Sequence, residues 1–324
     1  MTIDENLLVL LLALLLDRIA GDPQWLWSRM PHPVVVFGAA ISYADRQLNP
    51  ASLTGSQRRM NGIAAILALL LLAVAAGFVF NRFFALFGLV GILLETGLVA
   101  IFLAQKSLAD HVAAVAAALR EEGLAGGRAA VSRIVGRDPE TLDEPAVCRA
   151  AIESLAENFS DGVVAPALFF FFFPGLFAYK MLNTADSMIG HKSEKYIDFG
   201  WAAARLDDVA NWPAARLSIL LIAAGAWIRR GTSAGREAIR VAMRDGALHR
   251  SPNSGRPEAA MAGALNVQLA GPRIYGGVIV PEPMINDTGR DVATSGDIED
   301  GVSVFYASCM VLAGVTFGLF LCFL

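Results

Sequence analysis

Residues 60–104 read MNGIAAILALLLLAVAAGFVFNRFFALFGLVGILLETGLVAIFLA, and this stretch decides the fold class. It holds two apolar runs, 60–80 and 83–104, which are separated only by Asn81-Arg82. Each run has about the 20 residues that an α-helix needs to cross the hydrocarbon core of a bilayer. The pattern therefore predicts a hairpin of two membrane-spanning helices with its turn at Asn81-Arg82.

The composition of the whole chain is also typical of a membrane protein. The 324 residues are 55% hydrophobic and 17% charged, whereas soluble domains are about 45–50% apolar and about 25% charged. No long strand run is present, so we predict an all-α fold: a polytopic integral membrane helical bundle with a cytoplasmic helical lobe. The net charge of −4 does not indicate a nucleic-acid partner. The three cysteines lack the spacing of a metal site or a disulfide scaffold.

Three regions are predicted along the chain. Residues 1–105 would form N-terminal membrane helices, which begin with a span at 3–20. Residues 106–301 would form a catalytic region that faces the cytoplasm, and residues 302–324 a C-terminal membrane helix.

The catalytic region includes two short apolar segments, 163–178 and 214–228. Either both cross the membrane, or they are broken or re-entrant and leave residues 180–212 at the cytoplasmic face. Lysines and an arginine in 180–212 favour the second interpretation. The number of complete spans stays open between four and six.

Arginines indicate the orientation, because they are enriched on the cytoplasmic side of membrane proteins. The polar loop predicted at 21–59 contains several of them, which places it inside the cell. Residues 229–256 carry seven arginines against two acids; arginines 229–244 either anchor the protein to anionic membrane lipid or belong to a site. We expect a multi-pass protein of the cell (inner) membrane with its active site on the cytoplasmic side.

Glu95 lies near the middle of the second apolar run. A carboxyl group is costly at that depth, so it is either hydrogen-bonded between helices or a base or ligand at the floor of a site.

Carboxylates before the phenylalanine-rich patch form the first candidate site. Glu153 and Glu157 are four residues apart on one face of a predicted helix, and Asp161 follows its end. Like charges at this spacing repel each other unless a cation neutralises them. Carboxylate oxygens are suitable ligands for Mg²⁺. The alternative is a solvated acidic face that Arg149 offsets.

Two polar blocks follow the patch. Lys180, Asn183, Asp186 and Ser187 share one side of a helix, and His191-Lys192 come after the helix stop at Gly190, in a turn suited to phosphate. The run Arg205-Leu-Asp207-Asp208-Val-Ala-Asn211 is typical of a magnesium–phosphate site. Its alternative is a helix cap or an ion pair with Arg205.

A loop with His249, Arg250, Asn253 and Arg256 precedes a helix of small residues. Helix N-termini bind anions, and arginines strengthen that binding. We therefore expect an anionic-substrate site here, with a plain loop as the alternative.

These blocks together resemble the membrane-bound adenosylcobinamide-phosphate synthase family of cobalamin biosynthesis (CobD/CbiB). The resemblance covers nearly the whole chain: it is carried by LLLDRIAGDP at 14–23, MPHPVVVFG at 30–38, RDPETLDEPAVCRAAIESLAENFSDGVVAP at 137–166, YKMLNTADSMIGHKSEKYIDFGWAAARLDDVANW at 179–212, RDGALHRSPNSGRPEAAMAGAL at 244–265 and GPRIYGG at 271–277. Pro213 stands one place earlier than in the family pattern, which bears on the local helix start.

The resemblance implies an ATP-dependent amide ligase. It would join cobyric acid, a corrinoid, to (R)-1-amino-2-propanol or its O-phosphate, with ATP and Mg²⁺ as cofactors. Other late membrane enzymes of that pathway are further candidate partners. The implied residues fall into three groups: a catalytic set of Asp186, His191, Lys192 and His249; cofactor-binding residues Lys180, Asn183, Ser187, Arg205, Arg250, Asn253 and Arg256; and metal ligands among Glu153, Glu157, Asp161, Asp207 and Asp208.

Two other functions remain open from the residues. A membrane prenyl- or phospho-transferase would use the same acidic residues to hold a magnesium–diphosphate group. A small-molecule transporter would enclose a site between the broken segments 163–178 and 214–228.

Overall fold

The computed structural model describes residues 2–135, 139–171, 175–275, 278–280 and 282–324, and almost all of their regular structure is helical. The helices are α1 (Ile3–Ala20), α2 (Gln24–Trp27), α3 (Pro33–Leu48), α4 (Gly55–Ala85), α5 (Leu89–Phe102), α6 (Gln105–Val131), α7 (Glu144–Phe159), α8 (Ala165–Phe171), α9 (Gly175–Ile189), α10 (Trp201–Arg230), α11 (Thr232–Asp245), α12 (Gly255–Leu265) and α13 (Ser295–Phe323), with a 3₁₀ turn at Pro139–Thr141 and a π-helical segment at Ser160–Val164. Two antiparallel pairs of short strands, β1 (Leu269–Ala270) with β4 (Met284–Ile285) and β2 (Arg273–Tyr275) with β3 (Val278–Val280), complete it. The predicted all-α class is confirmed.

Four helical stretches of the described chain are long and apolar enough to cross a membrane. They are α4, the joined stretch Leu89–Val131 that contains α5 and α6, α10, and α13. This pattern agrees with the predicted polytopic bundle. The last of these helices begins at Ser295 rather than at 302.

The predicted helical hairpin exists, but its turn lies later than expected. Helix α4 continues through Asn81-Arg82 to Ala85, and α5 begins at Leu89. A side chain at Gly91 would place its Cβ 1.9 Å from the carbonyl oxygen of Phe84, so this close approach requires glycine. Asn81 donates to the buried Glu95 carboxylate at 3.4 Å, as expected for a hydrogen-bonded carboxyl between helices.

Two other expectations were wrong. Residues 21–59 are not simply a loop, because they contain α2 and α3; His32 caps α3 by accepting a hydrogen bond from the Val34 N–H at 3.1 Å, with Pro33 in the first turn. The apolar stretch 214–228 is not a short separate segment, since it is part of α10, which runs through Pro213 without a break. The carbonyl that Pro213 leaves without a helical donor is that of Val209, whose side of α10 is exposed.

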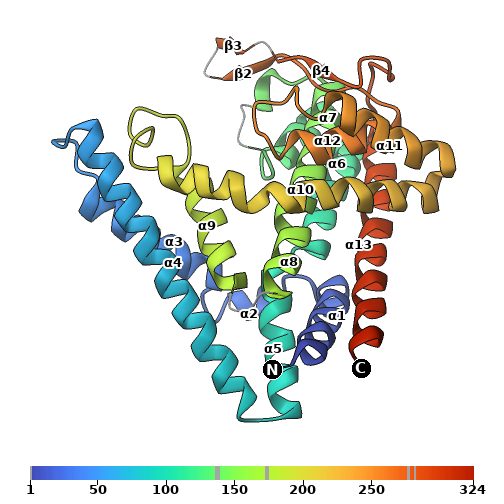
Figure 1. Ribbon diagram of the computed structural model, residues 1–324. Coiled ribbons are helices and arrows are strands. Elements are labelled where there is room, and N and C mark those ends of the chain that lie inside the picture. The colour runs from blue at the N-terminus through green and yellow to red at the C-terminus, as the bar shows by residue number, and fades with distance from the viewer. Residues whose placement is uncertain (1, 136–138, 172–174, 276–277, 281) are drawn as a thin grey trace.

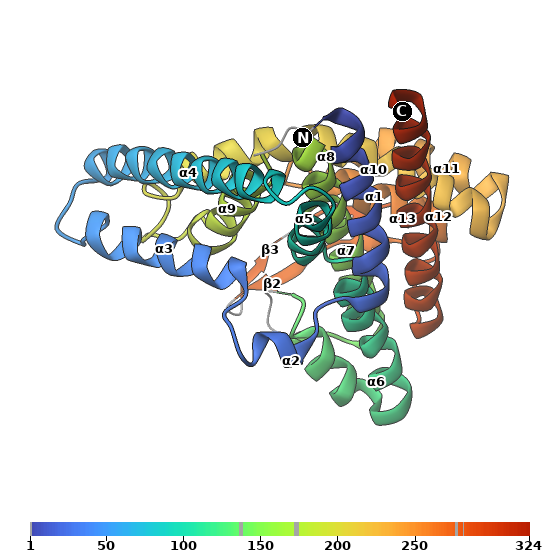
Figure 2. The same cartoon turned by 90° about the horizontal axis from the view of Figure 1, so that it is seen from below.

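The helices form an open arrangement beneath a lobe of shorter elements (Figure 1). Helices α4 and α5 reach down to a hairpin at one end, while α7, α11, α12 and the strands gather at the other. Helix α10 runs across the view in both Figure 1 and Figure 2, whereas α13 runs up it in both.

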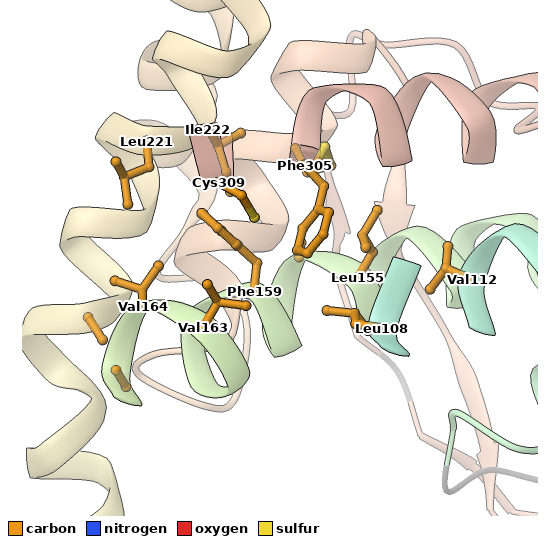
Figure 3. Close-up of a cluster of buried hydrophobic side chains, with 14 of the residues drawn as sticks. Leu108, Val112, Leu155, Phe159, Val163, Val164, Leu221, Ile222, Phe305 and Cys309 are labelled. Atoms are coloured by element: carbon orange, nitrogen blue, oxygen red, sulfur yellow. The ribbon is translucent and has the colours of Figure 1, made fainter. Parts of the chain in front are cut away.

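The core lies where α6, α7, α10 and α13 meet. Figure 3 shows Leu155 and Phe159 of α7 facing Phe305 of α13, with Leu108 of α6 and Ile222 of α10 around them. The rings of Phe159 and Phe305 pack edge to face with centroids 5.5 Å apart. Because α7 leads straight into the π-helical segment, this packing also positions Asp161.

Candidate functional site

Tyr179 joins three of the polar blocks at one point. Its hydroxyl lies 2.8 Å from the backbone oxygen of Asp161 and 2.9 Å from Oδ1 of Asn211. Asn211 in turn donates to Oδ2 of Asp207 at 2.8 Å. The π-helical segment, α9 and α10 are thereby bound together around a buried tyrosine. π-Helical turns of this kind occur frequently at functional sites.

Carboxylates crowd around this junction. Burial raises the pKa of Asp161 well above its ordinary value, and the nearby Glu157 and Asp207 carboxylates add to the rise. Oδ1 of Asp207 is buried and has no hydrogen-bond partner among the described residues. Buried polar atoms without partners are costly, and several carboxylates in one place favour a bound cation.

Lys180 is the cation that the fold itself brings to the cluster. Burial lowers the pKa of its ammonium group to about 8, and Asp161, Asp17 and Asp22 act in the opposite direction. Within the described residues this ammonium has only such longer-range partners and no hydrogen bond or ion pair. It therefore lies among carboxylates without a close partner in the described part of the chain.

Asp186 and His191 lie at the C-terminal end of α9. Burial raises the pKa of Asp186, Asp208 raises it further, and His191 opposes the rise. His191 itself is exposed. The structure thus brings Asp186 near the acidic cluster and places His191 at its solvent side.

The loop after α11 is attached to the same cluster. Asn253 donates to the backbone oxygen of Asp208 at 2.7 Å and accepts from Arg216 at 2.9 Å. The hydroxyl of Ser254 donates to Glu157 at 2.8 Å. The predicted anion loop and the predicted metal residues Glu157 and Asp208 therefore lie side by side.

Arg256 and His249 lie on this loop with their orientations constrained. Arg256 donates to the Ala242 carbonyl at 3.0 Å, and its buried Nε has no partner among the described residues. The Nδ1 atom of His249 accepts from the Ser251 N–H at 3.1 Å. A neutral His249 consequently carries its proton on Nε2.

Some predicted residues point elsewhere. Oε1 of Glu153 accepts the backbone N–H of Ala270 at 2.8 Å, so this buried carboxylate holds strand β1. Arg250 is exposed and faces Glu282 at 3.9 Å, and Lys192 is exposed. Searched over the described ranges, no three His, Cys, Asp or Glu side chains are arranged to hold a metal ion by themselves.

Three further predicted residues lie on the two helices of the cluster. Arg205 is exposed, and its guanidinium lies 3.4 Å from Oδ2 of Asp208. Ser187 donates its hydroxyl to the backbone oxygen of Asn183 at 2.9 Å, and Asn183 is half-buried.

The sequence did not single out the N-terminal residues around Lys180. Asp22 accepts from the Trp27 indole at 3.0 Å and lies 3.7 Å from Nε2 of His32. Burial lowers the pKa of His32, and Asp22 opposes that change. The sequence features that could have indicated Asp22 and His32 are the rigid turns Gly21-Asp22-Pro23 and Pro31-His32-Pro33.

The loop between α9 and α10 is tied to α3. The Lys195 ammonium lies 2.6 Å from Oδ2 of Asp45, and Tyr196 donates to the same oxygen at 3.2 Å. Asn49 donates to Oδ1 of Asp45 at 2.9 Å and to the Lys195 carbonyl at 3.3 Å. This network, which the sequence did not indicate, positions the turn that carries His191.

Comparison with known proteins agrees with the residue blocks quoted above. The model of the CobD/Cbib protein family matches residues 10–305. A cobalamin biosynthesis protein CobD from a Sinorhizobium species is 68% identical over 310 residues, which cover 95% of this chain and 96% of the relative. Proteins of the same name from Brucella suis and Rhodobacter capsulatus are 53% and 42% identical, with 94% to 96% of each chain covered. No solved structure matches the chain. With a family model and relatives that cover almost its whole length, this chain belongs to the CobD/CbiB family.

Proposed function

We propose that the protein acts in cobalamin biosynthesis as an ATP-dependent amide ligase. It would join the free carboxylate of cobyric acid to (R)-1-amino-2-propanol or its O-phosphate. The pathway is that named for the relatives. The observation that carries the reaction class is the convergence of Glu157, Asp161 and Asp207 with the ammonium of Lys180.

The acidic cluster fits a magnesium ion and a polyphosphate. Oδ1 of Asp207 is buried without a partner among the described residues, and Mg²⁺ typically takes one or two carboxylates and completes its shell with phosphates and water. Asp161 and Asp207 would hold the ion, and Lys180 the phosphates. When bound, ATP supplies the phosphoryl group that turns a carboxylate into an acyl phosphate, and Mg²⁺ offsets the charge of the triphosphate.

The chain's own residues then orient the two substrates. Arg256, together with Arg216 held by Asn253, would bind the carboxylate of the corrinoid or the phosphate of the amino alcohol. His191, beside Asp186, would take the proton that the ammonium group must lose before it attacks. His249 is less suited to that task, because its Nδ1 is occupied by the Ser251 N–H and its Nε2 carries the proton.

A magnesium-dependent prenyl- or phospho-transferase is the second candidate. The same buried carboxylates beside apolar helices would suit a diphosphate with a lipid tail. The transporter hypothesis required two broken segments. Residues 214–228 are instead part of the continuous helix α10, which argues against this hypothesis.

The deciding experiment is mass spectrometry of detergent-purified protein incubated with cobyric acid, Mg²⁺, ATP and either amine. We expect an amide product that requires ATP. The matched variants are Asp207→Asn, which should abolish the product, and Glu121→Gln on the exposed side of α6, which should not. Absence of product with both amines, from correctly folded wild-type protein, would exclude the ligase and favour diphosphate transfer.

A further inference from the structure

Helix α10 exposes one stripe of large side chains along its whole length. Trp201, Trp212 and Trp227 are 37%, 57% and 61% exposed. By the step of about 100° per residue in an α-helix, the three indoles lie within about 80° of one another around the axis. Val209 and Leu220, 71% and 58% exposed, share that side. A soluble helix would not show such a stripe to water.

Arginines are interleaved with the tryptophans. The guanidinium of Arg216 lies 4.5 Å from the ring centroid of Trp212, and that of Arg59 lies 3.8 Å from the ring centroid of Trp201. Tryptophan and arginine together are typical of the headgroup level of a bilayer, where the indole is amphipathic and the cation meets lipid phosphate. They are not typical of the hydrocarbon core.

The orientation of α10 relative to α13 agrees with a position at the headgroup level. Helix α10 runs across the view in Figures 1 and 2, whereas α13 runs up it in both, so α10 does not run alongside α13. If α10 crossed the bilayer, the half-buried Arg216 at its midpoint, which donates to Asn253, would lie near the centre of the membrane. Such a position is unfavourable for a cation.

The opposite side of α10 carries the candidate site. Asp207 and Asn211 are 8% and 1% exposed and face Tyr179 and α9. One helix thus presents its aromatic stripe outward and its acidic residues inward.

We propose that α10 lies in the plane of the membrane at the headgroup level and does not cross it. Its tryptophan stripe contacts lipid headgroups of the same bilayer that α4 and α13 cross. This orientation places the acidic site at the boundary between membrane and cytoplasm. It does not depend on which reaction the site performs.

The first test asks on which side of the membrane the two ends of α10 lie. In a Cys322→Ser background, single cysteines Ile197→Cys and Thr232→Cys are labelled with an impermeant maleimide in right-side-out and inside-out vesicles. Both are expected to label from the same side. The control pair, Ser52→Cys and Leu86→Cys, flanks α4 and is expected to label from opposite sides. Labelling of Ile197→Cys and Thr232→Cys from opposite sides overturns the proposal.

The second test measures depth and decides the matter if a cysteine is not labelled. Each variant keeps one tryptophan of α10, and the other four tryptophans of the chain are replaced by phenylalanine. The variants are reconstituted in vesicles whose lipids carry bromine at shallow or deep acyl positions. Trp201, Trp212 and Trp227 are expected to be quenched equally and only weakly by deep bromines. Strong quenching of Trp212 by deep bromines, with weaker quenching of Trp201 and Trp227, would show instead that α10 spans the bilayer.

Discussion

The hydroxyl of Tyr179 lies 2.9 Å from Oδ1 of Asn211, and the two side chains are separated by 32 positions in the sequence. The same hydroxyl is 2.8 Å from the Asp161 backbone oxygen. Tyr179 therefore holds the π-helical segment and α10 at a fixed separation, and with them the carboxylates of Asp161 and Asp207.

Tyr179→Phe removes this link and leaves a buried amide oxygen without its partner. We expect the free energy of unfolding to fall by about 1–3 kcal/mol and activity to fall by about 10–100-fold, as for residues that orient ligands. Thermal unfolding in detergent and the amide-forming assay measure the two effects. Tyr43→Phe, at a 63% exposed tyrosine of α3, is the control and should change neither.

Asp161→Asn separates the functional from the structural role of the cluster. Burial and neighbouring carboxylates raise the pKa of Asp161, so its charge opposes folding, and its removal should leave the protein equally or more stable. Activity should nevertheless fall by about 100-fold, which is about 2.7 kcal/mol of transition-state stabilisation. A variant that is less stable yet fully active would contradict both statements.

Lys180 should make ATP binding depend on pH near neutrality. Its pKa is lowered to about 8, so the ammonium loses its proton as the pH rises through that value, well below the ordinary pKa of lysine. We expect the KM for ATP to rise about tenfold per pH unit above pH 8. Lys180→Arg keeps its charge over this range and should abolish the inflection. An unchanged profile in that variant would remove Lys180 from the phosphate site.

Asp45→Asn tests whether α3 holds the turn that carries His191. Loss of the ion pair to Lys195 should favour local opening by about 1 kcal/mol, or about fivefold. Limited trypsin digestion would report it as faster cleavage after the exposed Lys192. Asp110→Asn breaks an exposed ion pair to Lys106 within α6 and should leave that cleavage rate as in the wild type.

Gly91→Ala tests the close approach at the membrane hairpin. The new Cβ would lie 1.9 Å from the Phe84 carbonyl oxygen, so the turn must shift, and we expect a loss of about 2–3 kcal/mol in stability. Gly97→Ala in the same helix meets nothing within 4 Å and should be neutral or stabilising by up to about 1 kcal/mol. Equal unfolding temperatures for the two variants would contradict the prediction.

The sequence by itself determined the helical class and the existence of the membrane hairpin, because apolar run length and helical period are local properties of a chain. It also indicated the residue types of the site, since carboxylates and a lysine beside phenylalanines are costly wherever they fold. The sequence did not determine how these residues assemble into a site. Glu153 and Glu157 lie one turn apart on α7, yet one holds the Ala270 N–H and the other Ser254.

Only the tertiary structure decided such outcomes, because they depend on contacts between distant segments. It brought Asp17 and Asp22 to Lys180 and Asn253 to Asp208, and it laid α10 across α13 (Figure 1). Local pattern predicts what a helix must bury or expose, but not which neighbour it packs against. The direction of α10 and the composition of the acidic site follow from that packing.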